Sequence, residues 1–310
     1  MPWDLIPLND GNAIPSIAFG TWTLGNGQGA IDQVEQAISV GFSHVDTAQV
    51  YRNEEEAGRA VRESGLARRD LFITTKYSGL HGLDIETSIH NSLKNLGVEY
   101  VDLYLIHHPN LARPDIPSAW AKMEALKRAG LAKSIGVSNF GIDELAILLA
   151  SAKIKPAANQ ILLHPYVYAR QAPLLAYTAA QGIVSEAYSA LTPITRQPGG
   201  PVDKPVNEIA QRLNATADQV LLAWVKAKGA VAVTTSSKKF RLEGYLAAAD
   251  LDLTPADIAA IDSAGEKGAR RETFIKTVRV IAGLMLFGAV IFRIYALLAP
   301  CARYSWSNVC

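Results

Sequence analysis

The chain has 310 residues, 49% of them hydrophobic and 19% charged, which excludes a disordered protein and is enough for one large α/β domain. Thirty Lys and Arg against 29 Asp and Glu give a net charge of +1, which argues against a protein that mainly binds nucleic acid. Two cysteines cannot form a disulfide framework or a four-thiolate metal site.

The first residues of the chain do not resemble a secretory signal. They lack a basic start, a continuous apolar core and a small-residue cleavage site, so we expect a cytoplasmic protein. Residues 7–15, PLNDGNAIP, predict a small β-hairpin with Asp10 and Gly11 at its turn.

From residue 16 onward, short apolar runs alternate with amphipathic segments, a pattern typical of βαβ units and a parallel sheet. The amphipathic segments have apolar residues at spacings of three and four, and Asp84, Gly130 and Gly182 supply helix caps. No Pro-, Gly- or Ser-rich linker separates the units, so we predict a single (β/α)8 barrel over residues 1–275, its bottom plugged by the hairpin. The eight predicted strands are 16–22, 44–48, 71–76, 100–108, 133–140, 157–163, 183–190 and 231–237.

Residues 276–310 form a tail unlike the barrel. Within it, residues 280–299 are uncharged except for Arg293, and as a helix they would cover about 30 Å, the thickness of a bilayer core. Arg279 and Arg303 flank this span, and the tail contains no acidic residue. Three interpretations remain open: a membrane anchor with the barrel facing the cytosol, a helix buried against the barrel, or a foreign tail appended by an error of gene prediction.

In a barrel of this kind, catalytic side chains stand at the carboxyl ends of the strands and in the loops that follow. The sequence places a set of polar residues there. They are Asp46, Tyr51, Lys76, His107, His108, Ser138, Asn139, Asn159, Gln160, Tyr188, Ser189, Thr234, Thr235, Ser236 and Ser237.

Asp46, Tyr51, Lys76 and His107 together form a set that can handle a proton. A tyrosine with a pKa near 10 is a poor acid at pH 7 unless a nearby cation stabilises its phenolate. Lys76 could supply that cation, Asp46 could hold the lysine, and His107 could hydrogen-bond a substrate oxygen. The residues alone leave alternatives, because a strand-end Asp often caps a helix, a single His is often structural, and Lys76 could form a Schiff base as in aldolases.

Several stretches between residue 5 and about residue 265 resemble the aldo-keto reductases. They are LNDGNAIPSIAFGTW, HVDTAQVYRNEEEAG, ITTK, YVDLYLIHHP, KSIGVSNF, NQILLHPY and AYSAL. The resemblance implies the NADPH-dependent reduction of an aldehyde, ketone or dicarbonyl to an alcohol. It also implies that Asp46, Tyr51, Lys76 and His107 are the catalytic tetrad. Tyr51 is then the general acid, its pKa lowered by Lys76, which pairs with Asp46, while His107 orients the carbonyl.

The resemblance further implies the contacts with cofactor and substrate. Trp22 and His108 would contact the substrate, and no metal is implied. The cofactor contacts would be Thr21, Ser138, Asn139, Gln160, Tyr188, Ser189, Leu191, Thr235, Ser236, Lys238 and Arg241.

The sequence departs from the family where the 2′-phosphate of NADPH would bind. Thr235 replaces the lysine that many members carry, while Arg241 stays aligned with the family arginine. Lys238 and Lys239 could supply the missing charge, so NADPH is expected in preference to NADH. The stretch VTTSSK is similar to a fungal branch that reduces ketones and dicarbonyls.

A second function remains open, that of a cofactor-binding sensor or scaffold subunit tethered to a membrane, as the potassium-channel β subunits of this superfamily suggest. The complete tetrad argues against it, and the apolar tail supports it. In either case we expect a monomer with a small-molecule carbonyl partner, no nucleic-acid partner, and membrane association through 280–299.

Overall fold

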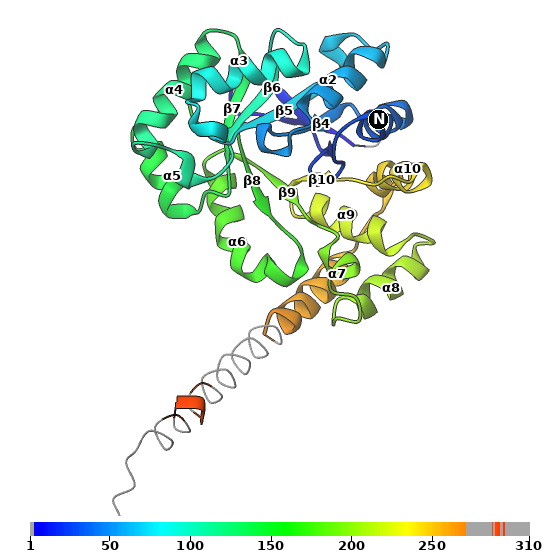
Figure 1. The fold of residues 1–310 in the computed structure, drawn as a ribbon. Coiled ribbons are helices and arrows are strands. Elements are labelled where there is room, and N and C mark those ends of the chain that lie inside the picture. Colours follow the sequence, from blue (N-terminus) through cyan, green and yellow to red (C-terminus); the bar gives the residue numbers. More distant parts are fainter. Residues whose placement is uncertain (1–2, 271–286, 288, 292–293, 295–310) are drawn as a thin grey trace, which may run out of the picture.

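The computed structural model describes residues 3–270 together with residues 287, 289–291 and 294. Eight parallel strands close into a barrel in the order β10-β3-β4-β5-β6-β7-β8-β9, which confirms the predicted (β/α)8 architecture (Figure 1). Almost every strand residue is buried because helices cover the outer face and side chains fill the interior. The strands are β3 (Ile17–Gly20), β4 (His44–Asp46), β5 (Phe72–Tyr77), β6 (Val101–Ile106), β7 (Ala132–Ser138), β8 (Ala158–Leu162), β9 (Val184–Tyr188) and β10 (Val231–Thr234).

The helices surround the barrel, mostly at the predicted positions. Asp84 caps one of them, since its carboxylate accepts the backbone N–H of Thr87 at 2.8 Å. The helices are α1 (Gln28–Val40), α2 (Glu54–Glu63), α3 (Ile85–Leu96), α4 (Ile116–Arg128), α5 (Ile142–Leu149), α6 (Pro165–Ala180), α7 (Thr192–Thr195), α8 (Asp203–Arg212), α9 (Ala217–Ala227) and α10 (Lys239–Ala247). Residues 255–270 form a further helix.

The predicted hairpin is also present, as β1 (Leu5–Pro7) paired with β2 (Ala13–Pro15). Gly11 has a φ of 86°, the left-handed conformation that this turn needs. Asn9 donates to the backbone oxygen of Pro156 at 2.8 Å, directly before β8, and Lys127 pairs with Asp10 at 2.8 Å. The hairpin therefore covers the amino-terminal end of the barrel, opposite the rim where catalytic side chains are expected.

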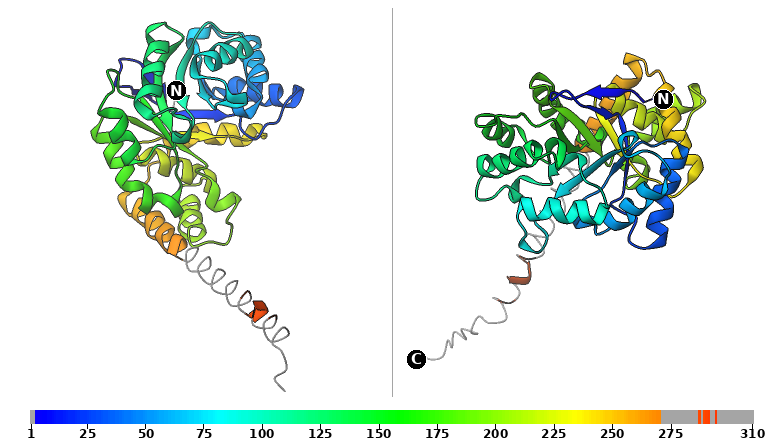
Figure 2. Two further views of the ribbon diagram at one scale, coloured as in Figure 1. Left: turned by 60° about the vertical axis from the view of Figure 1, so that its left-hand side comes forward. Right: turned by 90° about the horizontal axis from the view of Figure 1, so that it is seen from above.

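The helix at 255–270 lies against the start of α6 on the outside of the barrel (Figure 2). Two glycines permit this close approach. A Cβ on Gly265 would lie 2.2 Å from the backbone oxygen of Pro165, and one on Gly268 would lie 2.2 Å from the ring of Tyr166. Because Pro165 follows the carboxyl end of β8, the contact lies at the rim of the barrel.

No helix among the described residues is both long enough and apolar enough to span a bilayer. The span predicted at 280–299 lies outside the described residues except for a few positions. Among these, Phe287, Val290, Ile291 and Ile294 are helical, and each is at least 50% exposed. The three interpretations of the span as a whole concern residues outside the described part of the chain.

Candidate active site

A cavity of about 560 Å³ opens at the carboxyl ends of the barrel strands. Tyr51 and His107 line it near the centre of the rim, and Arg241 and Tyr245 on α10 line it as well. A single cavity therefore connects the predicted catalytic residues with the predicted site for the 2′-phosphate.

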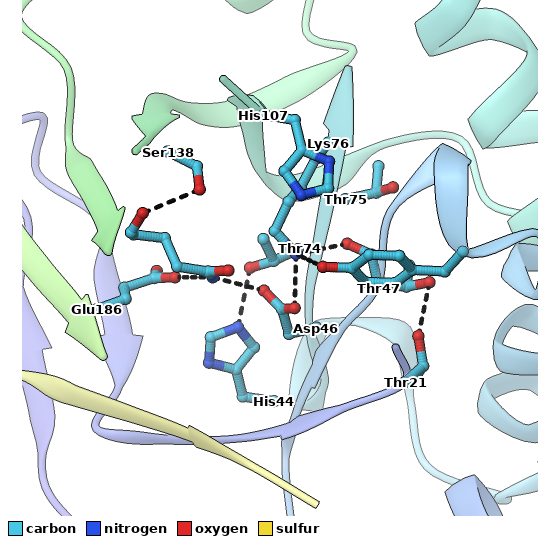
Figure 3. Close-up of polar contacts among 12 residues, drawn as sticks. Thr21, His44, Asp46, Thr47, Thr74, Thr75, Lys76, His107, Ser138 and Glu186 are labelled. Atoms are coloured by element: carbon cyan, nitrogen blue, oxygen red, sulfur yellow. Dashed lines mark hydrogen bonds and ion pairs between the residues drawn. The ribbon is translucent and has the colours of Figure 1, made fainter. Parts of the chain in front are cut away.

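Lys76 is the central charged residue beneath this cavity. Its ammonium, which is completely buried, donates to Asp46 Oδ1 at 2.6 Å, to the backbone oxygen of Thr47 at 2.9 Å and to Tyr51 Oη at 3.4 Å (Figure 3). The parallel pairing of β4 with β5 places Asp46 and Lys76 on neighbouring strands, and the short 3-10 turn Gln49–Tyr51 brings the phenol above them. Three of the four predicted catalytic side chains are thus in direct contact.

The charges around Lys76 keep it protonated. Burial lowers the pKa of Lys76, but the neighbouring Asp46, Tyr51 and Glu186 raise it more, so the net pKa lies above its usual value. A Schiff base requires a neutral amine. The surroundings of Lys76 therefore do not favour the aldolase alternative.

Tyr51 is subject to two opposing effects. Burial raises the pKa of Tyr51 above its usual value, and the positive charge of Lys76 opposes that rise. The prediction of a lowered pKa for Tyr51 is therefore wrong, because the local motif does not reveal how deeply the phenol is buried.

His107, which directly follows β6, is the fourth predicted catalytic residue and lines the same cavity. Burial, aided by the charge of Lys76, lowers the pKa of His107 to about 4, so its ring is neutral at pH 7. Nδ1 shares a hydrogen bond of 3.0 Å with Ser78 Oγ, and the ring stands edge-on to Tyr51 with 5.7 Å between centroids. A neutral imidazole carries a single N–H, which can hydrogen-bond a carbonyl oxygen but is not an imidazolium acid.

A second polar group lines the cavity on the side of β7 to β9. Tyr188 Oη donates to Asn139 Oδ1 at 2.8 Å, and Asn139 Nδ2 donates to the backbone oxygen of His107 at 3.0 Å. Asn139 and Ser189 have φ values of 62° and 61°, a left-handed backbone that is uncommon outside glycine and tends to occur at functional sites. Ser138 Oγ donates to the backbone oxygen of Gln160 at 2.9 Å.

Glu186, His44 and Ser78 also belong to this group, although no motif in the sequence indicates them. Glu186 lies two residues before Tyr188 on β9, so strand alternation alone would have placed it on the same face as Tyr188. Gln160 Nε2 donates both to Asp46 Oδ2 at 2.8 Å and to Glu186 Oε2 at 2.5 Å. Burial lowers the pKa of His44, beneath Asp46, to about 4.

The far end of the cavity contains an arginine that already has an anionic partner. Arg241 donates from Nε and Nη2 to Asp218 Oδ2 at 3.1 and 2.9 Å. Thr235 also lines the cavity, and its hydroxyl has no hydrogen-bond partner within the described part of the chain. Leu191 and the exposed Trp22 line the same cavity.

Some predicted residues do not line this cavity. Thr21 Oγ1 is buried and donates to Thr47 Oγ1 at 2.9 Å, while His108 Nδ1 accepts the backbone N–H of Asn110 at 3.2 Å and so caps a short 3-10 turn. Ser236 Oγ accepts the backbone N–H of Lys238 at 3.1 Å, and the Lys238 side chain is exposed. Lys76 lies below the cavity floor and acts on it through Tyr51.

These groups fit a nicotinamide dinucleotide. The aromatic ring of Tyr188 suits stacking on a nicotinamide ring. The hydroxyl of Thr235, which has no partner within the described residues, and the guanidinium of Arg241 suit the oxygens and the negative charge of a phosphate.

Comparisons with known proteins agree on one family. The model of the aldo/keto reductase family matches residues 16–266. The NAD/NADP-dependent indole-3-acetaldehyde reductase of Schizosaccharomyces pombe is 37% identical over 85% of this chain and 95% of its own length. The methylglyoxal reductase DkgA of Yersinia pestis is 35% identical over 83% of this chain and 91% of its own length. A crystal structure of a Bombyx mori aldo-keto reductase in complex with NADP superposes with a TM-score of 0.78 at 32% identity, covering 84% of this chain and 92% of that one.

Proposed function

Because the chain belongs to the aldo/keto reductase family and is an NAD(P)-dependent oxidoreductase, we propose that Tyr51 is the general acid with which it reduces a carbonyl to an alcohol. The observation that carries this proposal is the buried Lys76 ammonium, which lies 3.4 Å from Tyr51 Oη and 2.6 Å from Asp46 directly beneath the cavity.

The proposed proton transfer depends on these three side chains. Tyr51 Oη gives its proton to the carbonyl oxygen, and the phenolate that remains is stabilised by the adjacent Lys76 ammonium. Asp46 holds the ammonium in place from below, so its position does not depend on the substrate. When bound, a reduced nicotinamide cofactor supplies the hydride to the carbonyl carbon.

The position of the carbonyl is proposed to depend on His107 and Trp22. The neutral ring of His107 donates its N–H to the carbonyl oxygen beside Tyr51, and the exposed indole of Trp22 forms one wall for the rest of the substrate. The substrate class proposed is aldehydes, ketones and dicarbonyls. The names of two relatives, an indole-3-acetaldehyde reductase and a methylglyoxal reductase, support an aldehyde or dicarbonyl.

NADPH is the proposed cofactor. Ser138, Asn139 and Gln160 would hold its carboxamide and Tyr188 would stack on its nicotinamide, with Ser189 and Leu191 along its pyrophosphate. Thr235, Ser236, Lys238 and Arg241 would hold the 2′-phosphate. The NADP complex of the silkworm relative supports this choice, and so does the guanidinium in the cavity. The stretch VTTSSK supports a place in the fungal branch of the family.

The test is the Tyr51→Phe variant, which keeps the ring and removes the proton. Its kcat for NADPH oxidation with a panel of aldehydes, ketones and dicarbonyls should fall by about 10²–10⁴. NADPH affinity, measured by quenching of protein fluorescence, should not change. Activity retained by Tyr51→Phe would refute the assigned acid. If the unaltered enzyme binds NADPH but turns over no carbonyl, the sensor function is favoured instead.

We further propose that residues 1–275 act as the catalytic barrel and residues 276–310 as an appendage that attaches it to a membrane through 280–299. The apolar composition of that span supports this, and so do the exposed side chains of Phe287, Val290, Ile291 and Ile294.

A further inference from the structure

Glu186 is a buried carboxylate without a role in the proton transfer described above. Its side chain has no exposure to solvent, and within the described residues its Oε1 has no hydrogen-bond partner. Its other oxygen, Oε2, accepts the amide N–H of Gln160 at 2.5 Å. A carboxylate that is buried and incompletely hydrogen-bonded is costly, so its presence needs an explanation.

The hydrogen bonds connect Glu186 to Tyr51 without a break. Gln160 Nε2 has two hydrogens, one donated to Glu186 and the other to Asp46 Oδ2 at 2.8 Å. Asp46 Oδ1 in turn accepts from Lys76, which donates to Tyr51. The chain of contacts crosses the barrel interior from β9 through β8 and β4 to β5, as Figure 3 shows for Glu186, Asp46 and Lys76.

The charges in this cluster do not balance when Glu186 is ionised. One ammonium, Lys76, then has two carboxylates near it, Asp46 from β4 and Glu186 from β9. Asp46 and Lys76 are the charged groups that act on Glu186. The two strands that pair with β9 add no charge: β8 contributes the neutral Gln160, and β10 has the sequence VAVT. Burial, with a contribution from Asp46, raises the pKa of Glu186 to about 7, against the opposing effects of Gln160 and Lys76.

We propose that Glu186 is a positioning residue for the proposed reduction, which holds the Gln160 amide against Asp46 and sets by its charge how strongly Lys76 polarises Tyr51. This role rests on the proposed function of Tyr51. With Glu186 protonated, the field of Lys76 is offset by one carboxylate and favours the Tyr51 phenolate. With Glu186 ionised, a second carboxylate offsets it, and Tyr51 becomes a weaker acid.

The proposal predicts a pH dependence near neutrality that Tyr51 and His107 do not produce. As pH rises through about 7, Glu186 loses its proton and kcat for carbonyl reduction falls by up to about tenfold. Burial raises the pKa of Tyr51 above its usual value and lowers that of His107 to about 4, so neither produces an inflection near pH 7.

The decisive variant is Glu186→Gln, because Gln can still accept from Gln160 but carries no charge. In the full-length enzyme its kcat should show no inflection near pH 7 and should match the low-pH rate of the unaltered enzyme. The control is Glu124→Gln, which removes a buried carboxylate from α4 that accepts the N–H groups of Lys153 and Ile154, and the inflection should persist in it. An inflection that persists in Glu186→Gln, or that is absent from the unaltered enzyme, would overturn the proposal.

A second readout does not depend on turnover. Infrared titration of the unaltered protein should show the C=O band of a buried carboxylic acid disappear near pH 7, and Glu186→Gln should lack that band. A band unchanged by Glu186→Gln would refute the titration of Glu186. A normal infrared titration in a protein that reduces no carbonyl would instead count against the proposed function of Tyr51.

Discussion

The ion pair between Arg241 and Asp218 bears on the choice of nicotinamide cofactor if Arg241 holds the 2′-phosphate as proposed. Both donors, Nε and Nη2 of Arg241, are directed at one oxygen of Asp218. An incoming 2′-phosphate would have to share this guanidinium with the carboxylate, and the two anions would repel each other. We therefore expect the pair to weaken the proposed preference for NADPH.

Asp218→Asn should raise the affinity for NADPH several-fold and leave that for NADH nearly unchanged, because only NADPH carries the 2′-phosphate. Dissociation constants for both cofactors, measured by fluorescence, test this. The control is Asp257→Asn, which breaks the pair with Arg212 outside the cavity lining and should change neither constant. Equal gains for NADPH and NADH in Asp218→Asn would contradict the idea.

At the residue scale, the sequence predicted that Asp46 pairs with Lys76, but not that Gln160 links Asp46 to Glu186. Asp46 and Tyr51 belong to one short motif, so a common site for them could be predicted from the sequence. Gln160 and Asp46 are 114 residues apart, and no local pattern indicates that one amide bridges Asp46 and Glu186. Pairing of this kind depends on barrel closure, which places distant strands opposite one another.

Two helices that position the site meet at a glycine. Gly58 on α2 faces the end of α3, where a Cβ would lie 2.2 Å from the backbone oxygen of Leu96. The same oxygen accepts from Arg62 Nη1 at 2.5 Å, which satisfies one of the last carbonyls of α3. A side chain at Gly58 would therefore force apart two helices rather than displace a flexible group.

Gly58→Ala should lower the free energy of unfolding by about 2–3 kcal/mol, since the backbone of α3 cannot yield locally. Urea unfolding followed by circular dichroism gives the value. Gly29→Ala is the matched control, because that glycine also lies in a helix, α1, but a Cβ there would meet nothing within 4 Å. It should be unchanged or more stable by up to about 1 kcal/mol. Similar losses in both variants would show that α2 and α3 are not in critical contact.

Periodicity predicted where helices occur better than where they end. Residues 207–228 continue one amphipathic pattern, yet they contain the end of α8 and all of α9. The break follows from turn chemistry, because Asn214 takes a φ of 51° and Thr216 starts α9 with a capping box to Gln219.

In the whole molecule, the two ends of the barrel differ: one end is closed by apolar packing, and the other end holds the candidate active site. The hairpin covers the amino end with an apolar cluster that includes Leu8, Ile14 and Leu103, while the carboxyl end holds the cavity. The sequence allowed this arrangement to be predicted because every strand and crossover is local. Whether residues 280–299 enter a membrane or pack on the protein could not be predicted, since an apolar span fits a bilayer and a protein core equally well.

The membrane proposal can be tested on the whole chain. Full-length protein should sediment with phospholipid vesicles, whereas a chain ending at Lys276 should stay in the supernatant. Replacing Phe287, Val290, Ile291 and Ile294 together by serine should release the full-length protein, because these exposed side chains supply apolar contact. Equal sedimentation of the full-length and shortened chains would contradict the anchor.

The two glycines at 265 and 268 have a consequence for how this enzyme can be oriented on a surface. They fix the helix at 255–270 beside Pro165 and Tyr166, at the rim that bears the cavity, while the hairpin lies at the opposite end of the barrel. A tether attached at residue 270 would therefore hold the cavity entrance near the support, and a tether attached at the hairpin turn, Asp10 and Gly11, would turn the entrance toward the bulk solution. A carbonyl compound dissolved in a supporting lipid layer would have the shorter path to the cavity in the first orientation, and one dissolved in water would have the shorter path in the second.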